Sequence, residues 1–332
     1  MAEARNALSF HGKGSTLFGK YLVNVLLSII TLGIYSFWGK VKILQYQYDQ
    51  AQLNGSPFQF LGTGKQFFFG FLKFLGIFIV LELVLFGGMF GLGFAIPQTV
   101  ENMFPLMIAT FVLFLVFMIL IGLLVVVAIN SKLRYRLRNS TWRGLNGIYR
   151  GKNKELIPTV LLGLFLTVIT LGIYGPWFSV KVRRYIYSKL SFGNLTLRFD
   201  GRGGELFLIG LKGLLLTIIT LGIYGFWYGR NLYRWSTTKS VLIQNGTDLP
   251  LATPVTAGAL FKLWVPNILL LVITLGIAYP WIVVRTLRFF FANLTLPDAL
   301  DLDNLTQGES GAGNALGESL GDFLDLGDFG IL

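Results

Sequence analysis

One eight-residue motif constrains this chain more than any other feature. The pattern Thr-Leu-Gly-Ile-Tyr-x-x-Trp begins at Thr31 and recurs at Thr170 and Thr220, and a fourth copy from Thr274 has Ala278 in place of the tyrosine. Each copy ends an apolar stretch and precedes basic residues. Four matches of this length cannot arise by chance, and internal repeats of this kind predict a chain built from similar structural units.

Long apolar stretches make up most of the sequence. A helix needs about 20 apolar residues to cross a bilayer, and only 13% of the residues are charged, against roughly a quarter in soluble domains. We therefore predict a mainly α membrane protein with six apolar segments, of which four carry the motif. The six segments are residues 17–38, 67–94, 106–129, 157–180, 206–228 and 260–284.

The linkers between these segments favour short β-strands. An asparagine turn is followed by alternating apolar residues and glycines, as in residues 58–64 and 195–203, which is typical of strands with tight turns. The predicted unit is therefore a strand, a glycine turn, an apolar helix, the motif, and then a basic amphipathic helix.

The distribution of Lys and Arg leaves two arrangements of the motif open. Six alternating spans place basic linkers on both sides of the membrane, against the positive-inside rule. If residues 67–129 form an inserted spanning hairpin and each motif turns back near its glycine, all basic linkers share the cytoplasmic side. Otherwise each motif is an ordinary helix end, and its aromatic residues lie at the interface. The glycines are Gly33, Gly172, Gly222 and Gly276, and the interface tryptophans are Trp38, Trp177, Trp227 and Trp281.

Charge divides the chain into two regions. Residues 298–332 hold eight of the 16 acidic residues and no Lys or Arg, so we expect an acidic, largely disordered tail. Residues 1–297 form the repeat-built membrane domain, in which 28 basic groups face eight acidic ones for a net charge of +20. Such a basic body is typical of proteins that contact anionic lipids. Nucleic acid is not expected, because the charges flank apolar segments; the oligomeric state stays open.

Two groups of polar residues are candidate sites. Glu82 is the only acidic residue in the middle of an apolar stretch, and the motif threonines Thr31, Thr170, Thr220 and Thr274 occupy equivalent positions. An intramembrane carboxylate is a candidate functional site, but a structural ion pair with a basic residue of another stretch is the favoured reading. A threonine in a membrane helix more often bonds its own backbone. The second group contains candidate contacts to lipid headgroups: Lys132, Arg134, Arg136, Arg138, Arg183 and Arg184.

Composition excludes most enzyme chemistry. The chain has no cysteine and one histidine, His11, so thiolate metal sites, thiol nucleophiles and a Ser-His-Asp triad are not expected. We predict no cofactor, no metal and no enzymatic activity.

The repeated motif, the start Phe10-His-Gly-Lys-Gly14 and the segment Thr141-Trp142-Arg143-Gly144 resemble the YjgN-like family of bacterial inner-membrane proteins, whose function is unknown. The resemblance covers roughly residues 8–297 and implies a multi-pass protein of the cytoplasmic membrane. It transfers no catalytic or binding residue. We predict a transporter- or channel-like protein for a small solute or lipid, with a polar cavity at Glu82 and the motif threonines. The alternative is a non-catalytic module that binds anionic lipid or a protein partner at the cytoplasmic boundary.

Overall fold

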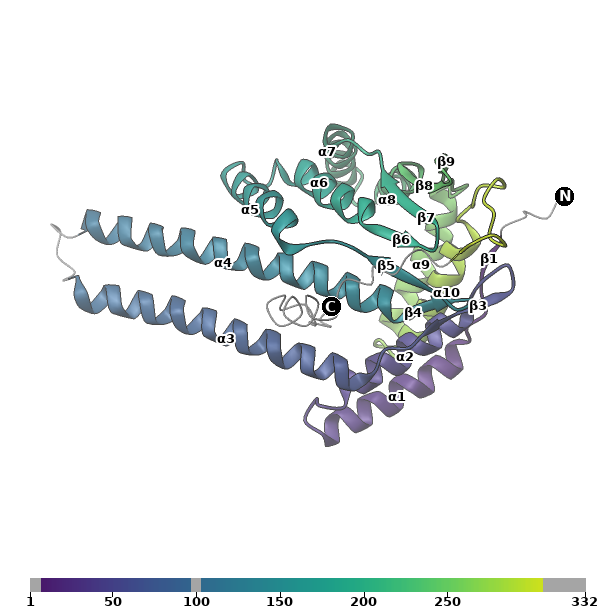
Figure 1. Ribbon diagram of the computed structural model, residues 1–332, viewed down its shortest axis with the longest axis horizontal. Coiled ribbons are helices and arrows are strands. Elements are labelled where there is room, and N and C mark those ends of the chain that lie inside the picture. Colours follow the sequence, from purple (N-terminus) through teal and green to yellow (C-terminus); the bar gives the residue numbers. More distant parts are fainter. Residues whose placement is uncertain (1–6, 97–102, 307–332) are drawn as a thin grey trace.

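The computed structural model describes residues 7–96 and 103–306 (Figure 1). Within these ranges, helical hairpins alternate with short strands, and the strands form one 9-stranded sheet. In chain order the elements are β1 (Leu8–Phe10), α1 (Gly14–Ile30), α2 (Ser36–Gln50), β2 (Ala51–Leu53), β3 (Ser56–Phe60), α3 (Gly64–Ala95), α4 (Met103–Arg138), β4 (Ser140–Trp142), β5 (Leu145–Tyr149), α5 (Asn153–Ile169), α6 (Gly175–Ser188), β6 (Leu190–Phe192), β7 (Leu195–Phe199), α7 (Gly203–Ile219), α8 (Gly225–Thr238), β8 (Ser240–Gln244), β9 (Thr247–Pro250), α9 (Ala257–Ile273) and α10 (Tyr279–Ala292).

The sheet places both ends of every helical hairpin on one side of the molecule. Each strand pairs antiparallel with the next strand along the chain, in the order β1 to β9. Because β1 precedes α1 and β2 follows α2, the pairing of β1 with β2 brings the two helix ends together at the sheet. The same holds for α3/α4, α5/α6 and α7/α8, and the bridge between Ala252 and Thr295 does this for α9/α10. The four hairpin loops at the motifs therefore lie away from the sheet.

The four copies of the motif form the same tight turn. Helix α1 ends at Thr31, and the N–H of Gly33 donates to the carbonyl of Ser28 at 2.6 Å while the N–H of Leu32 donates to Ile29. This is the Schellman arrangement that closes a helix C-terminus. Leu32 has φ +50° and Gly33 has φ +90°, and the other three copies repeat these angles within a few degrees. The chain reverses there, so each motif both ends one helix and turns the chain back into the next.

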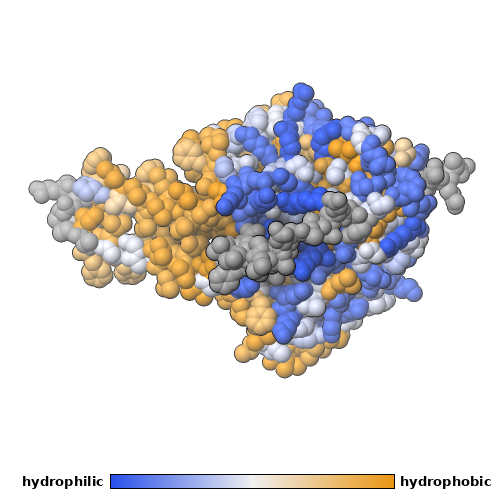
Figure 2. All heavy atoms as spheres, in the orientation of Figure 1, coloured by the Kyte–Doolittle hydropathy of each residue, from blue (hydrophilic) through white to orange (hydrophobic). Residues whose placement is uncertain are grey.

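The motif-bearing segments are thus not single long helices. Each is split into an apolar helix and an amphipathic helix, whereas α3 and α4 are continuous. Among the described residues, two helices are long and apolar enough to cross a membrane, Gly64–Phe94 and Met103–Arg138. They project from the body, and Figure 2 shows this projection as almost wholly hydrophobic, while most of the hydrophilic surface lies around the sheet.

The helical hairpins close into a ring. Each helix packs against the next along the chain, and α10 packs against α1 and β1. Trp38 covers the first residue of α3, Gly64, in the way that Trp177 covers the first residue of α7, Gly203. Trp281 covers Gly14, the first residue of α1, in the same way. The last hairpin therefore packs against the first through the same tryptophan–glycine contact that joins hairpins adjacent in the chain. A hydrogen bond from a helix side chain to the carbonyl of a glycine that precedes a helix also recurs around the ring. The pairs are Gln45 with Gly62, Arg134 with Gly151, Arg184 with Gly201 and Arg288 with Gly12.

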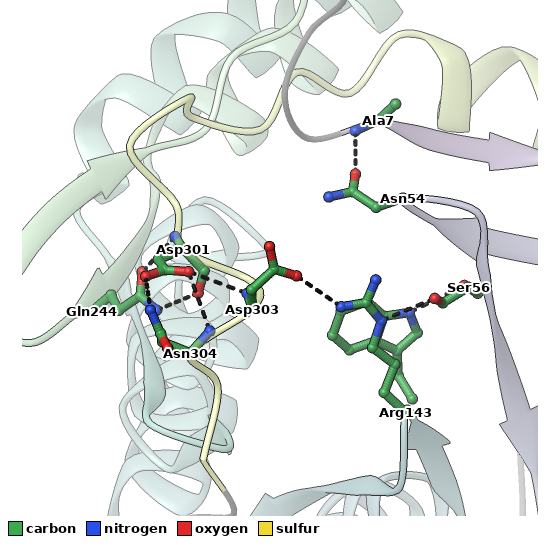
Figure 3. Close-up of polar contacts among 9 residues, drawn as sticks. Ala7, Asn54, Ser56, Arg143, Gln244, Asp301, Asp303 and Asn304 are labelled. Carbon is green, nitrogen blue, oxygen red and sulfur yellow. Dashed lines mark hydrogen bonds and ion pairs between the residues drawn. The ribbon is translucent and has the colours of Figure 1, made fainter.

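The segment after α10 fills the end of the sheet. Leu300 and Leu302 are buried in a cluster to which four of the strands contribute, with Trp142 at 1% exposure. Gln244 exchanges two hydrogen bonds with the backbone of Asp301, and Arg143 pairs with Asp303 at 3.0 Å (Figure 3). The packed body therefore extends through Leu302, beyond the boundary expected at residue 298, because leucines alternate with the acids there. Residues 307–332 of the expected disordered tail lie outside the described residues.

Candidate functional site

An apolar cavity of about 540 Å³ lies at the centre of the ring, which we call the apolar chamber. Residues from β1, α2, β2, β3, α4, α8 and α10 line it, so elements from distant parts of the chain form its walls. Most of the lining side chains are aromatic or aliphatic. They are Leu8, Phe10, Leu44, Gln47, Tyr48, Ala51, Phe58, Arg136, Tyr233, Leu287, Phe290, Phe291 and Leu294.

A second cavity of about 430 Å³ adjoins the first, and we call it the basic chamber. It contains three cationic side chains, Lys40 from α2 and Lys132 and Arg136 from α4. The two chambers share Leu44, Gln47 and Arg136, so they are neighbouring parts of one hollow. The remaining lining residues of the basic chamber are Tyr21, Asn24, Ile43, Phe67, Tyr135 and Tyr279.

The two chambers lie at different heights in the ring. Tyr279 is the first residue of α10 and lines the basic chamber, whereas Phe290 and Phe291 in its last turn line the apolar chamber. Because α10 runs from its hairpin loop towards the sheet, the basic chamber is nearer the loops and the apolar chamber is nearer the sheet. The order from the sheet outwards is thus buried leucine cluster, apolar chamber, basic chamber, hairpin loops.

The cations of the basic chamber have no described counter-charge. In residues 7–96 and 103–306, no carboxylate lies within ion-pair distance of Lys40, Lys132 or Arg136. The ion pairs found there lie at the sheet end, such as Glu205 with Lys239 at 3.1 Å. An excess of like charge in a partly enclosed site attracts an anion, since the low-dielectric walls strengthen its field.

The basic run 132–138 continues α4, so its four cations lie on two helix faces. Lys132 and Arg136 are four residues apart and share the chamber face. Arg134, on the other face, donates to the carbonyl of Gly151 at 3.2 Å, and Arg138 lines neither chamber. Of the other predicted headgroup contacts, Arg184 donates to the carbonyl of Gly201 at 3.0 Å. Arg183 donates to Ser236 and covers the ring of Phe199, so these arginines hold neighbouring elements together.

The four motif threonines do not converge. Each is the C-cap of a different helix, and its hydroxyl donates to the carbonyl four residues earlier. The same oxygen accepts the N–H four residues later, at 2.9 Å for Tyr35. The threonine thus holds both sides of the turn and leaves no free hydroxyl for a shared site. The donor bonds run from Thr31 to Leu27, Thr170 to Leu166, Thr220 to Leu216 and Thr274 to Leu270, at 2.6–2.7 Å.

Glu82 and the tryptophans also have defined places. Glu82 lies in the middle of α3, half-buried, and lines neither chamber. Trp227 is 45% exposed and stacks on Tyr224, whereas the other three motif tryptophans cover the glycines described above. Three of the motif tryptophans therefore pack one hairpin against another, and Trp227 is partly exposed at the surface.

Most of the chamber residues could not be predicted from the sequence. Lys40 follows the first motif, but its role depends on α4 lying beside α2, which no local pattern reveals. The aromatic residues Tyr233 and Phe290 come from α8 and α10, which only ring closure brings near α2. The pair Lys132 and Arg136 had a usable signal, a spacing of four residues on a helix.

A sequence profile described as "Bacterial protein of unknown function (DUF898)" matches residues 5–200, 194–239 and 232–323 of this chain. The chain belongs to this family. Its relatives include proteins named inner membrane protein YjgN. The one from Salmonella typhimurium is 39% identical over 102 residues, 31% of this chain and 26% of the relative. That from Escherichia coli O157:H7 is 27% identical over 212 residues, 55% and 50% of the two chains.

The aligned regions thus span half or less of these family relatives. No solved structure matches the chain. The family and the names of its members confirm the predicted resemblance and support a location in the bacterial inner membrane.

Proposed function

We propose that this protein is a multi-pass, non-catalytic module of the cytoplasmic membrane that binds anionic lipid at the basic boundary of its ring. Helices α3 and α4 cross the bilayer as a hairpin, because each exceeds the length of about 20 apolar residues that a span needs. The remaining hairpins enter the bilayer with their loops and with the exposed apolar faces of their first helices. They do not span it, because their second helices are 14 or 15 residues long and amphipathic.

The loop leucines carry this proposal. Leu32, Leu171 and Leu221 are 93–94% exposed, and Leu275 is 91% exposed, although each has a positive φ. A left-handed conformation costs an L-residue roughly 1–2 kcal/mol, and these side chains gain almost no packing within the protein. An apolar surrounding, the hydrocarbon edge of the bilayer, offsets that cost through the hydrophobic effect.

The basic residues would then lie at the level of the lipid headgroups. Lys42 donates to the hydroxyl of Tyr35, and Lys181 does the same to Tyr174. Each pair lies next to a loop, where tyrosine and lysine are typical of the membrane interface. With the sheet in the cytoplasm, these cations face the anionic leaflet, where each contributes about 1 kcal/mol of attraction.

The rival reading, transport, would require a polar point at membrane depth. The motif threonines are satisfied within their own turns, and Glu82 lines neither chamber. The hollow of the ring lies instead between the loops and the sheet. This placement favours the lipid-binding module.

Quenching of tryptophan fluorescence by brominated lipids tests the proposal. The protein is reconstituted in phosphatidylcholine bilayers with a fixed fraction of either brominated phosphatidylglycerol or brominated phosphatidylcholine. Trp227 and Trp281 are partly exposed near the loops, so we expect the anionic lipid to quench more strongly at low salt. The excess should shrink at 1 M salt, where the Debye length is about 3 Å. Equal quenching by the two lipids at low salt would contradict the proposal.

A further inference from the structure

We propose that the apolar chamber and the basic chamber together bind one single-chain amphiphile with an anionic headgroup. The hydrocarbon chain lies in the apolar chamber, and the headgroup lies among Lys40, Lys132 and Arg136. This inference rests on the proposed function, since the ligand comes from the adjoining lipid, but it concerns a stoichiometric site inside the ring rather than enrichment around it.

The apolar chamber has the size and lining of a ligand site. Its volume of about 540 Å³ lies within the range of roughly 300–1,000 Å³ that small-molecule pockets occupy. Phe58, Phe290 and Phe291 contribute to a lining that has few polar groups. A hydrocarbon chain gains about 0.8 kcal/mol for each methylene that it buries, whereas water gains few hydrogen bonds there.

The headgroup end is defined by charge. Lys132 and Arg136 lie one turn apart on the same face of α4, and Lys40 reaches the same chamber from α2. None of the three pairs with a described carboxylate, and a phosphate or carboxylate would supply the missing negative charge. Charge-assisted hydrogen bonds from lysine and arginine to such oxygens are about twice as strong as neutral ones.

The two chambers meet in the order that an amphiphile requires. Arg136 and Gln47 line both, so the polar donors lie at the junction of the apolar and the basic parts. The basic chamber is nearer the hairpin loops, which is the side that would face the bilayer. A lipid chain that leaves the bilayer would thus enter past the cations and place its headgroup at the depth of neighbouring headgroups.

Native mass spectrometry of the full-length chain in a non-ionic detergent tests the site. The probes are 1-palmitoyl lysophosphatidate, palmitate and 1-palmitoyl lysophosphatidylcholine. We expect one lysophosphatidate per chain, bound at least tenfold more tightly than the zwitterionic lysophosphatidylcholine. Palmitate has the same hydrocarbon chain as the lysophosphatidate but a carboxylate in place of the phosphate. Its affinity therefore shows whether the site accepts any anionic amphiphile or requires a phosphate. Binding of either anion supports the proposal.

Three double variants locate the headgroup. Lys132→Gln with Arg136→Gln should weaken lysophosphatidate binding at least tenfold, and Lys132→Arg with Arg136→Lys should restore most of it. Lys152→Gln with Lys154→Gln removes the same charge from exposed residues at the start of α5, which lie outside both chambers. That control should change affinity less than twofold. A similar loss in both charge-removing variants would overturn the proposal, as would equal affinity for the zwitterionic probe.

Chain length separates the apolar chamber from the cations. 1-Octanoyl lysophosphatidate should bind at least tenfold more weakly than the palmitoyl form, because it buries fewer methylenes. Equal affinities would show that the chamber holds no chain. Enrichment of brominated phosphatidylglycerol with no stoichiometric amphiphile would leave the proposed function standing and reject this site alone.

Discussion

The leucine and glycine of each motif show how one residue pair sets the form of a hairpin. Leucine is an unusual residue for the C′ position of a Schellman motif, where glycine is common, yet Leu32 and Leu221 both adopt φ near +50°. The glycine that follows has φ of about +90°, which side chains disfavour. From the sequence, Gly222 was one of the glycines near which the chain could turn back. The structure favours the turn, because no described neighbour lies within 4 Å of the position that a Cβ would take.

At this scale we predict that Gly222→Val destabilises the protein more than Gly210→Val. Gly222 has φ +95°, so the β-branched valine adds strain of about 1–2 kcal/mol. Gly210 lies inside helix α7 with open space around it, so valine fits there without a clash. Thermal unfolding in detergent measures the difference. Equal melting temperatures of the two variants would show that the φ of residue 222 carries no energetic cost.

The elements divide into those that the sequence predicted and those that it did not. Short strands were predicted in residues 58–64 and 195–203, and β3 and β7 confirm them, because alternating residues and glycine turns are local signals. Whether a motif ends a helix or reverses the chain was left open, since both readings use the same residues. The bend is settled by the pairing of β1 with β2, which are some 40 residues apart, and long-range pairing leaves no local trace.

Glu205 links the start of α7 to the end of α8 and gives a prediction at the element scale. Its carboxylate accepts hydrogen bonds from Trp235 Nε1 at 2.8 Å and from Lys239 Nζ at 3.1 Å. The tryptophan bond, followed by the lysine, lowers the pKa of Glu205. We expect Glu205→Gln to cost about 1 kcal/mol at pH 7, because solvent screens part of this ion pair.

The same contact predicts a pH dependence. A carboxyl group with a lowered folded pKa contributes full stability above its unfolded pKa, about 4.3, and loses it as the pH falls through the folded value. The melting temperature should therefore fall in acid, and less steeply for Glu205→Gln. Glu155→Gln is the matched control, since Glu155 occupies the equivalent turn of α5 and pairs with Lys189 but has no tryptophan partner. A larger effect at Glu155 than at Glu205 would refute the prediction.

At the scale of the whole molecule, the first and last helices, α1 and α10, complete the ring. The contact of Trp281 with Gly14 joins α10 to α1. The leucines after α10 pack with apolar residues of the strands in the buried cluster at the end of the sheet. Repeats in the sequence predicted similar units but not their closure, because closure depends on the angle between neighbouring hairpins. The chambers follow from that closure, and for this reason the central site could not be predicted from residue patterns.

The acidic segment after α10 gives the last prediction, since its charge alone suggested a dispensable tail from residue 298. Deletion of residues 307–332 should leave the melting temperature within about 1 °C of the full chain, because the buried leucines stay in place. Deletion of residues 299–332 also removes Leu300 and Leu302, which are 4% and 6% exposed. Each such loss costs about 2–5 kcal/mol by analogy with leucine-to-alanine changes in cores.

The shorter deletion also separates packing from charge. It removes five acidic residues, Glu309, Glu318, Asp322, Asp325 and Asp328, while it retains Asp303 and its pairing with Arg143. If the distal acids compete with lipid for the basic boundary, quenching by brominated phosphatidylglycerol should rise at low salt and return to the full-length value at high salt. Unchanged quenching at low salt would show that these acids do not shield the ring. A loss of folding in this variant would place residues beyond Thr306 in the core.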